Sequence, residues 1–298
     1  MPRSRFATYA ELAKSGIVAL VVISVLGGYL VGHRLEAPFD FKKLLATLFG
    51  ILFLASGSSA LNQIQERQID ASMLRTAKRP LPSGRISLAS AWVFVLVTVA
   101  SGLFLLDWVD RVQLYLGLCA LISYNGLYTL WWKKHWSYAA VPGAIPGALP
   151  ILMGHAAGDG SVTSPGGLYL FFLLFFWQMP HFWVLALKYR EDYAQGGFPT
   201  LPVTHGSTLT VARIGLWALA YVALSLVAPL FLPVRTFYLI VALGMGAKLL
   251  WELRGFQKAP ESRSWLRFFL WVNFSLIAYV FAAVADLWGV YLRAWITQ

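Results

Sequence analysis

The chain has 298 residues, of which 58% are hydrophobic and only 12% are charged. Soluble domains carry roughly 25% charged residues, so the composition excludes an ordinary water-soluble protein and indicates one that lies mostly in lipid. The formal net charge of +11 would indicate nucleic acid in a soluble protein. In a membrane protein the basic residues instead report the orientation of the spans, and we expect no nucleic-acid partner.

Nine apolar segments are long enough to cross a bilayer, which takes about 20 residues of helix. They do not alternate as the strands of a membrane barrel would, and backbone groups in lipid must pair within their own segment. The sequence therefore predicts an all-α bundle of about nine transmembrane helices, in a single membrane domain over residues 1–298. In chain order the expected spans are 15–32, 44–62, 87–107, 112–132, 138–158, 167–188, 209–232, 236–253 and 266–290.

The positions of the basic residues predict the orientation of these spans. Most lysines and arginines lie before the first span or in the loops after the second, fourth, sixth and eighth spans, although the loop with Lys42 and Lys43 is ambiguous. Lysine and arginine accumulate on the cytoplasmic side, so we expect a cytoplasmic N-terminus and an outer C-terminus in the inner (plasma) membrane. The single cysteine, Cys119, lies within a span, which excludes a disulfide framework.

The segment after the second span, NQIQERQIDASMLRTAKRP (62–80), combines acids and bases. Asn62, Glu66 and Asp70 follow one another at intervals of four residues, and each such step along a helix rises about 6 Å and turns about 40°. Their oxygens therefore share one stripe at the cytoplasmic end of the span. The alternative is that these charges only set the orientation, but acids contribute little to orientation.

A second mixed segment, KYREDYAQGGFPTLPVTHG (188–206), follows the sixth span. Carboxylates beside bases suit a diphosphate, because Mg²⁺ binds one or two carboxylates together with substrate phosphates and bases bind the remaining oxygens. An apolar tail on the diphosphate would dissolve among the helices. Such a clamp would also stabilise the leaving group of an allylic diphosphate, and the aromatic-rich sixth span offers ring faces to a carbocation.

These two segments resemble a known family. Asn62-x₃-Glu66-x₃-Asp70, followed by MLRTAKRP (73–80), resembles the first aspartate-rich motif of the UbiA superfamily of intramembrane prenyltransferases. The form with glutamate and LPSGRIS resembles the branch of this superfamily that farnesylates heme B. Further agreement comes from YN at 124–125, GAIPGALPILMGHAAGDG at 143–160, WQMPHFWVLAL at 177–187 and DYAQGGFPTLPV at 192–203.

The resemblance implies an enzyme that transfers the farnesyl group of farnesyl diphosphate to a vinyl group of heme B. Water adds to the product, giving heme O and diphosphate, a step in making the heme of terminal oxidases. It implies Mg²⁺ as cofactor, membrane lipid as surroundings, and heme A synthase or a terminal oxidase assembly as partner. The alternatives are a UbiA-type enzyme acting on an aromatic quinone precursor and a non-catalytic heme or lipid transporter, whose broken helices the fifth span resembles.

The resemblance also assigns residues. It places Asn62, Glu66, Asp70 and Asp192 in the catalytic metal–diphosphate site. It places Arg75, Lys78, Arg79, Lys188 and Arg190 on the diphosphate. Gln63 and Glu66 stand where the superfamily usually has aspartates, and Lys188 stands where the second motif usually has its first acid. These departures favour one firmly bound Mg²⁺ over a symmetric site with several ions.

His181, near the inner end of the sixth span, is the candidate for contact with heme, through the iron or a propionate. Heme iron favours histidine ligands. The open alternative is a structural hydrogen bond, since the neighbouring Pro180 frees a backbone carbonyl.

Overall fold

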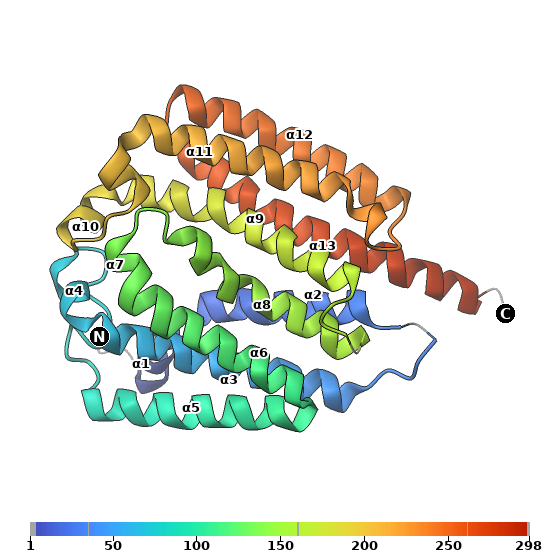
Figure 1. Cartoon of the computed structure of the whole chain (residues 1–298), viewed down its shortest axis with the longest axis horizontal. Helices are drawn as coiled ribbons and strands as arrows, with labels where there is room; N and C mark the ends of the chain where they lie inside the picture. The colour runs from blue at the N-terminus through green and yellow to red at the C-terminus, as the bar shows by residue number, and fades with distance from the viewer. Residues whose placement is uncertain (1–3, 35, 160, 261, 297–298) are drawn as a thin grey trace. The chain divides into compact units, whose positions relative to one another are not determined.

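The computed structural model describes residues 4–34, 36–159, 161–260 and 262–296, with side chains described as far as residue 289. Every regular element in these ranges is a helix (Figure 1). The predicted all-α fold is confirmed, and it follows from the need of backbone groups in lipid to pair within their own segment.

Within the described ranges, eight helices are long and apolar enough to cross a membrane. They are α2 (Ser15–Gly32), α3 (Phe41–Gln65), α5 (Leu88–Val109), α8 (Ala140–Asp159), α9 (Pro165–Lys188), α11 (Leu201–Leu226), α12 (Thr236–Lys258) and α13 (Ser264–Ile296). The remaining expected span, 112–132, consists of α6 (Arg111–Leu121) and the π-helix η1 (Ile122–Trp132) that continues it. The difference between eight and nine spans is therefore this one divided segment.

Short helices occupy the connections. They are α1 (Arg5–Leu12), α4 (Arg67–Ser72), α7 (Lys133–His135), α10 (Arg190–Gln195) and the 3₁₀ turn η2 (Ala228–Leu230). Helix α11 begins eight residues before the expected span at 209. Pro202 is compatible with this start, since it lies in the first turn, where proline is tolerated. Gly206, with φ of 81°, then kinks the helix in a conformation that glycine adopts without steric cost.

The chain forms two compact units, each made of separate segments. Residues 1–23, 41–150 and 189–204 form the first unit, and residues 24–40, 151–188 and 205–298 form the second. In the first unit α5 runs alongside α3 (Figure 1), and a side-chain carbon at Gly102 would lie 2.7 Å from the backbone nitrogen of Leu54. In the second unit α12 packs along α13. Boundaries between the two units fall inside α2 and α8. A single domain over 1–298 stays a prediction.

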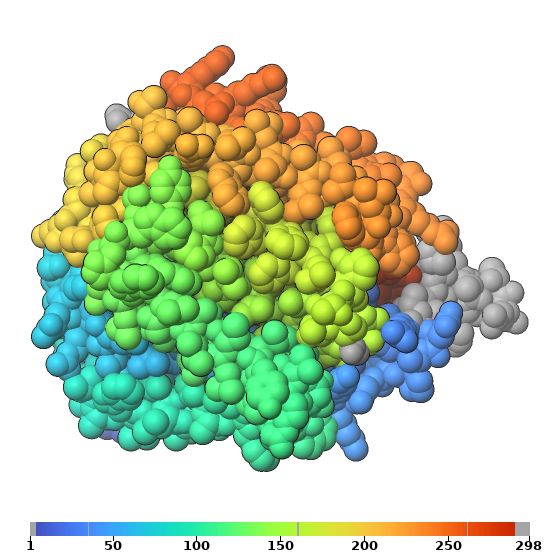
Figure 2. Space-filling model, viewed as in Figure 1, coloured from blue at the N-terminus to red at the C-terminus, as the bar shows by residue number. Residues whose placement is uncertain are grey.

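Large apolar side chains cover the outside of the first unit. In Figure 2 the green side chains of α6 and η1 form part of the surface that is drawn. The exposed residues on these two helices include Tyr115, Ile122, Leu127, Leu130 and Trp131. A surface of this kind is favourable in contact with lipid and unfavourable in contact with water, as the composition predicts.

Candidate active site

The junction between α3 and α4 carries the predicted oxygen stripe. Glu66 separates the two helices with φ of −100° and ψ of 5°, but the hydrogen-bond ladder continues across it. The backbone N–H of Glu66 donates to the oxygen of Asn62 at 3.0 Å, and that of Asp70 donates to the oxygen of Glu66 at 2.8 Å. The side chains of Asn62, Glu66 and Asp70 are all buried, at 2%, 2% and 0% exposure. The four-residue spacing therefore survives the break.

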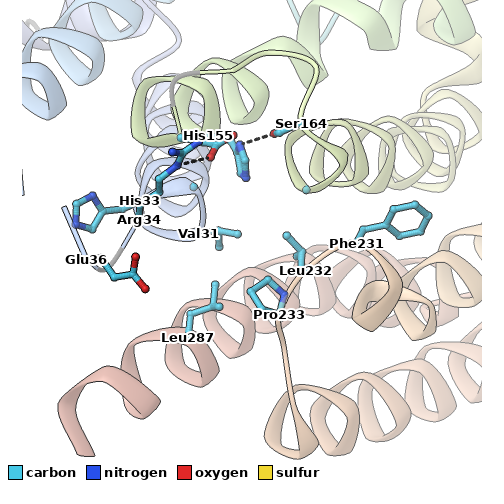
Figure 3. Close-up of a pocket in the computed structure, with 13 residues that line it drawn as sticks. Val31, His33, Arg34, Glu36, His155, Ser164, Phe231, Leu232, Pro233 and Leu287 are labelled. Atoms are coloured by element: carbon cyan, nitrogen blue, oxygen red, sulfur yellow. Dashed lines mark hydrogen bonds and ion pairs between the residues drawn. The ribbon is translucent and has the colours of Figure 1, made fainter. Parts of the chain in front are cut away.

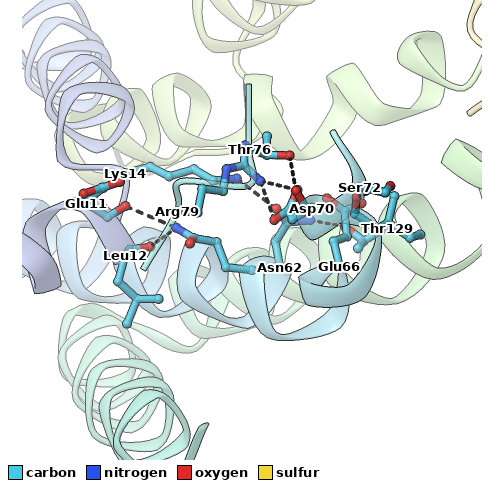
Figure 4. Close-up of polar contacts among 12 residues, drawn as sticks. Glu11, Leu12, Lys14, Asn62, Glu66, Asp70, Ser72, Thr76, Arg79 and Thr129 are labelled. Atoms are coloured by element: carbon cyan, nitrogen blue, oxygen red, sulfur yellow. Dashed lines mark hydrogen bonds and ion pairs between the residues drawn. The ribbon is translucent and has the colours of Figure 1, made fainter. Parts of the chain in front are cut away.

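Basic side chains hold the oxygens of this stripe (Figure 4). Lys14 Nζ donates to Asn62 Oδ1 at 2.8 Å. Arg79 Nη1 donates to both carboxylate oxygens of Asp70, at 2.8 Å and 2.7 Å. Charge-assisted hydrogen bonds of this length are about twice as strong as neutral ones.

Lys133, the first residue of α7, completes the arrangement. Its Nζ donates to both carboxylate oxygens of Glu66, at 2.7 Å and 2.9 Å, and lies 4.3 Å from the centre of the Phe198 ring. These contacts join the stripe to the start of α7 and to the segment that follows α10. We call the following set the charged cluster: Lys14, Asn62, Glu66, Asp70, Arg79 and Lys133.

Neutral hydrogen bonds fix the stripe from behind. Asn62 Nδ2 donates to Thr129 Oγ1 at 3.2 Å, and Thr76 Oγ1 donates to the backbone oxygen of Asp70 at 2.9 Å. Gln63 Nε2 donates to the backbone oxygen of Leu12 at 2.9 Å, one of the carbonyls left free where α1 ends. The other end of this amide, Gln63 Oε1, is buried without a hydrogen-bond partner among the described residues.

The cluster changes the pKa values of its own groups. Burial acts to raise the pKa of Glu66, but the charge of Lys133 and its hydrogen bonds outweigh burial, and the pKa is lowered. Burial lowers the pKa of Lys14 to about 7, and repulsion from Arg79 adds to this effect. Lys14 also has φ of 54°, a left-handed conformation that is uncommon outside glycine. The turn between α1 and α2 thus directs an easily deprotonated ammonium group at Asn62.

The second predicted segment lies beside the first one in the first unit. The guanidinium carbon of Arg75 lies 5.2 Å from the ring centre of Tyr189 and 5.8 Å from that of Tyr193. A side-chain carbon at Gly196 would lie 2.7 Å from Met73 Sδ. The segments at 73–79 and 189–198 therefore pack against each other, although more than 100 residues separate them.

The other predicted site residues lie outside the charged cluster. Asp192, between Tyr189 and Tyr193 on α10, is partly buried and makes no ion pair with a described residue. Lys78 and Arg190 are exposed. Lys188 belongs to the second unit, where its Nζ lies 5.3 Å from the centre of the Trp265 ring.

His181 also belongs to the second unit. Its ring lies between those of Trp177 and Phe269, with centres 4.6 Å and 4.9 Å away. Its Nδ1 atom is buried and has no hydrogen-bond partner in the described part of the chain. The structural hydrogen bond expected as the alternative therefore does not involve this nitrogen.

Lys14 and Lys133 are the residues that sequence reasoning missed, since both were counted only as markers of orientation. Nothing in the hydropathy distinguishes Lys133 from Lys134. The available signal is the polar pair Asn125 and Thr129 upstream in η1, because Thr129 marks a helix face that turns toward Asn62. Lys133 follows Thr129 by four residues, on the same face.

The donor set suits Mg²⁺ in its chemistry. Glu66 and Asp70 offer carboxylate oxygens, and Asn62 offers an amide oxygen. Gln63 adds a buried amide oxygen that has no partner within the described part of the chain. Among the described residues, no three or more His, Cys, Asp or Glu side chains form a metal-binding group, so Asp192 does not complete such a group with Glu66 and Asp70. Mg²⁺ takes one or two protein carboxylates and completes its shell with water and phosphate, which this pair satisfies.

Comparison with known proteins gives a consistent assignment. Residues 21–294 match the UbiA prenyltransferase family. The chain is 45% identical to protoheme IX farnesyltransferase of Bdellovibrio bacteriovorus, over 94% of this chain and 96% of that protein. It is 40% identical to the protein of the same name from Aquifex aeolicus, over 80% of each chain.

Solved structures share the fold at lower identity. A digeranylgeranylglyceryl phosphate synthase aligns with a TM-score of 0.77 at 20% identity, covering 94% of this chain and 98% of that one. A UbiA homolog from Archaeoglobus fulgidus bound to DMAPP and Mg²⁺ aligns with a TM-score of 0.67 at 18% identity, covering 93% and 99%. The chain therefore belongs to the UbiA family of prenyltransferase enzymes, alongside relatives that are named protoheme IX farnesyltransferase.

Proposed function

We propose that this membrane enzyme transfers the farnesyl group of farnesyl diphosphate to a vinyl group of heme B, with addition of water, to give heme O and diphosphate. The names of relatives at 35–45% identity over most of the chain support this reaction. The observation that carries it is the charged cluster, in which Asn62, Glu66 and Asp70 are buried and each accepts a hydrogen bond from a base. The second predicted segment, which contains Asp192, lies beside this cluster. A cluster of this composition suits an anion that arrives with its own divalent cation.

The first part of the reaction breaks the bond between the allylic carbon and the diphosphate oxygen. Asn62, Glu66 and Asp70 would hold Mg²⁺, which neutralises charge on the departing diphosphate. Asp70 accepts from Arg79 in the structure, and Glu66 accepts from Lys133. With Mg²⁺ as their positive partner, the two carboxylates would release Arg79 and Lys133, which could then donate to phosphate oxygens. Asp192 would reach the Mg²⁺ of the bound diphosphate through water, because it forms no metal-binding group with Glu66 and Asp70 among the described residues. Further positive charge would come from Arg75, Lys78, Lys188 and Arg190.

The second part joins the farnesyl carbon to heme. The electron pair of the vinyl group attacks the allylic carbon, and the cation that remains on the porphyrin side takes up water and loses a proton. The bonding electrons of the broken carbon–oxygen bond leave with diphosphate. Aromatic rings attract such cations by roughly 0.5–2 kcal/mol each, and Phe198 and the stacked rings of Tyr124 and Tyr128 lie on elements that adjoin the charged cluster.

His181 is our candidate for contact with heme. Its Nδ1 atom, which has no hydrogen-bond partner among the described residues, is able to accept a hydrogen bond from a protonated propionate or to bind iron. The rings of Trp177 and Phe269 on either side of it restrict its orientation. We further propose that the enzyme lies in the inner (plasma) membrane with the charged cluster on the cytoplasmic side, and passes its product to heme A synthase or a terminal oxidase assembly.

The test uses the purified full-length chain with farnesyl diphosphate, heme B and Mg²⁺. We expect equal amounts of diphosphate and of heme O, identified by mass spectrometry. Asp192→Asn should lower turnover by about 100-fold or more, as removal of an electrostatic group at a reacting centre does. The matched control is Glu191→Gln, an exposed acid on the same helix, which should retain wild-type turnover.

Other outcomes would contradict the proposal. Heme binding without release of diphosphate would indicate a transporter. Prenylation of 4-hydroxybenzoate, with heme B left unchanged, would indicate the sister reaction on a quinone precursor. Wild-type turnover in Asp192→Asn would remove that residue from the site while leaving the reaction itself intact.

A further inference from the structure

A second polar region lies in the second unit, where a pocket of about 450 Å³ opens next to the residues that follow α2 and α8 (Figure 3). None of its residues belongs to the charged cluster. Its apolar wall includes Leu232 and Leu287. Its polar lining consists of His33, Arg34, Glu36, His155, Asp159 and Ser164.

Close packing of α2 against α8 fixes one wall of the pocket. The contact uses two small-residue pairs, Gly28-x₃-Gly32 on α2 and Gly154-x₃-Gly158 on α8. A side-chain carbon at Gly32 would lie 2.4 Å from the backbone oxygen of His155, closer than real side chains approach. Such glycine pairs let helix backbones meet in membranes. The backbone of His155 is therefore held against α2 without an intervening side chain.

Ser164 and Gly167 form the hydrogen-bond network at the Nδ1 side of the His155 ring. Ser164 Oγ accepts the backbone N–H of Gly167 at 3.2 Å and lies 3.3 Å from His155 Nδ1. With its oxygen accepting from Gly167, the hydroxyl has its proton available for Nδ1. In the tautomer in which this hydroxyl donates to Nδ1, the neutral ring carries its own proton on Nε2.

This tautomer leaves a hydrogen-bond donor for the pocket. His155 is only 4% exposed, and its Nε2 makes no hydrogen bond with another described residue. Figure 3 shows the edge of the ring opposite Ser164 turned toward the pocket. A ligand that accepts a hydrogen bond from this N–H group would satisfy it without displacing another partner.

The charges around the pocket disfavour an anion. Arg34 Nε pairs with Asp159 Oδ1 at 3.3 Å, whereas Glu36 makes no ion pair with a described residue. Burial lowers the pKa of His33, which keeps that ring neutral at neutral pH. Two carboxylates therefore face one guanidinium, and a bound carboxylate or phosphate would be repelled.

We propose that this pocket binds an uncharged, lipid-soluble molecule whose carbonyl oxygen accepts a hydrogen bond from His155 Nε2. The rest of the molecule would lie against Leu232 and Leu287. Two membrane-soluble sources offer this chemistry, a quinone ring and the ester group of a neutral glyceride. Heme is a poorer fit, because iron binds a nitrogen that carries no proton, whereas the proposed hydrogen bond needs the proton on Nε2.

The experiment measures binding to the full-length chain in detergent, by isothermal titration calorimetry. The probes are a decyl-substituted benzoquinone, dioctanoylglycerol and, as the charged control, decanoate. We expect saturable binding of one uncharged probe per chain, and the stronger of the two identifies the source. Decanoate should bind at least about tenfold more weakly, as expected for an anion brought to a negatively charged site.

Variants at His155 separate the hydrogen bond from the shape of the pocket. His155→Gln keeps an N–H donor and should stay within about threefold of the wild-type affinity, whereas His155→Leu should bind at least about tenfold more weakly. Ser164→Ala removes the hydroxyl that lies against Nδ1 and should give an intermediate loss. A thermal melt of each variant checks that it is folded.

Three results would overturn the proposal. The first is absence of saturable binding by the wild type, and the second is equal affinity of His155→Leu and His155→Gln for the uncharged probes. The third is a heme absorption shift that persists in His181→Ala but disappears in His155→Leu, which would make the pocket a heme site. Farnesyl transfer does not enter these measurements, so they stand apart from the proposed reaction.

Discussion

The charged cluster of the first unit and the pocket of the second unit both place carboxylates at helix ends, but they balance them differently. In the cluster, Asp70 and Glu66 are buried, and each accepts two hydrogen bonds from a base. In the pocket, Asp159 pairs once with Arg34, whose side chain is 71% exposed, and Glu36 has no ion-pair partner among the described residues.

This difference in burial and pairing indicates that the charged cluster, rather than the pocket, is the region whose carboxylates and bases change partners when a ligand binds. A buried ion pair contributes little to stability, since desolvation cancels most of the attraction, and apolar residues would often serve as well. The two buried pairs of the cluster, Asp70 with Arg79 and Glu66 with Lys133, are therefore better explained by a ligand that takes over the pairing. An exposed pair such as Arg34 with Asp159 contributes about 0–1 kcal/mol and is compatible with a pocket for an uncharged molecule.

The largest effect is expected from Asp70→Asn, which keeps the shape of the side chain but removes its charge. Arg79 would then be left with an uncharged partner, and the proposed metal site would lose a carboxylate. Turnover should fall by about 1,000-fold, the upper range for an electrostatic group at a reacting centre. The measurement is the rate of diphosphate release at saturating farnesyl diphosphate.

The control for this change is Asp107→Asn. Asp107 also pairs with an arginine, Arg111, at 2.6 Å, but both side chains are exposed, at 36% and 73%. Its substitution should leave turnover unchanged. If Asp70→Asn retained wild-type turnover in folded protein, the charged cluster would have no part in the reaction.

Much of the first unit could be predicted from the sequence. The stripe of Asn62, Glu66 and Asp70 depends only on helical periodicity, and it persists although Glu66 interrupts the helix. The fold class depends on apolar length, which is equally local. The π-helical half of the expected span 112–132 was not foreseen, because apolar periodicity does not distinguish a π-helix from an α-helix.

The partners of these residues could not be predicted, because they depend on contacts between distant segments. Lys133 lies 67 residues beyond Glu66, and Lys14 lies 48 residues before Asn62. Both lysines also satisfy the charge rule for cytoplasmic loops, so they carried no additional signal. Similarly, the pocket depends on the approach of two glycine pairs that lie on different helices.

The second prediction concerns Lys133→Met, which keeps the length of the side chain and removes its charge. Glu66 would lose its only ion-pair partner among the described residues, and removing one member of a buried pair costs about 3–5 kcal/mol unless the group is protonated. The pKa of Glu66 should therefore rise. Turnover should fall by about 100-fold, measured as heme O formed over time.

Lys134→Met supplies the matched control, because Lys134 is the next residue and makes no ion pair with the described residues. It should retain turnover and thermal stability. Equal losses in the two variants would mean that the loop needs positive charge only in general, for example to hold its orientation in the membrane. The distinction between Lys133 and Lys134 would then be lost.

The third prediction tests the packing that forms the wall of the pocket. In Gly154→Ala the added carbon would lie 2.1 Å from the backbone oxygen of Val25, so α2 and α8 must move apart. Overpacking of this kind costs about 1–3 kcal/mol, and the thermal midpoint in detergent should fall by several degrees. Affinity for the uncharged probes should also fall.

Gly244→Ala is the control for this substitution. Gly244 lies within α12, and a carbon added there meets no atom within 4 Å. Alanine is favoured over glycine in a helix by about 1 kcal/mol, so the midpoint should stay constant or rise. An equal fall in both variants would contradict the claim that α2 and α8 need direct backbone contact.

The smallest expected effect is a change in pH dependence caused by Lys14. Its pKa is lowered to about 7 in the folded chain, against about 10.4 for an ordinary lysine. Between these values the unfolded chain binds the proton that the folded chain has lost, so Lys14 makes stability rise with pH in this range. Binding of a diphosphate has the opposite preference, since it favours the charged ammonium group.

The KM for farnesyl diphosphate should therefore increase as pH rises through 7, by about tenfold between about pH 6 and about pH 8. Lys14→Arg should give a nearly constant KM over this range, because a guanidinium group stays charged. Lys134→Arg, at a lysine that makes no ion pair with the described residues, should keep the wild-type profile. If Lys14→Arg followed the wild-type profile, another group would titrate, and the charge of Lys14 would have no influence on diphosphate binding.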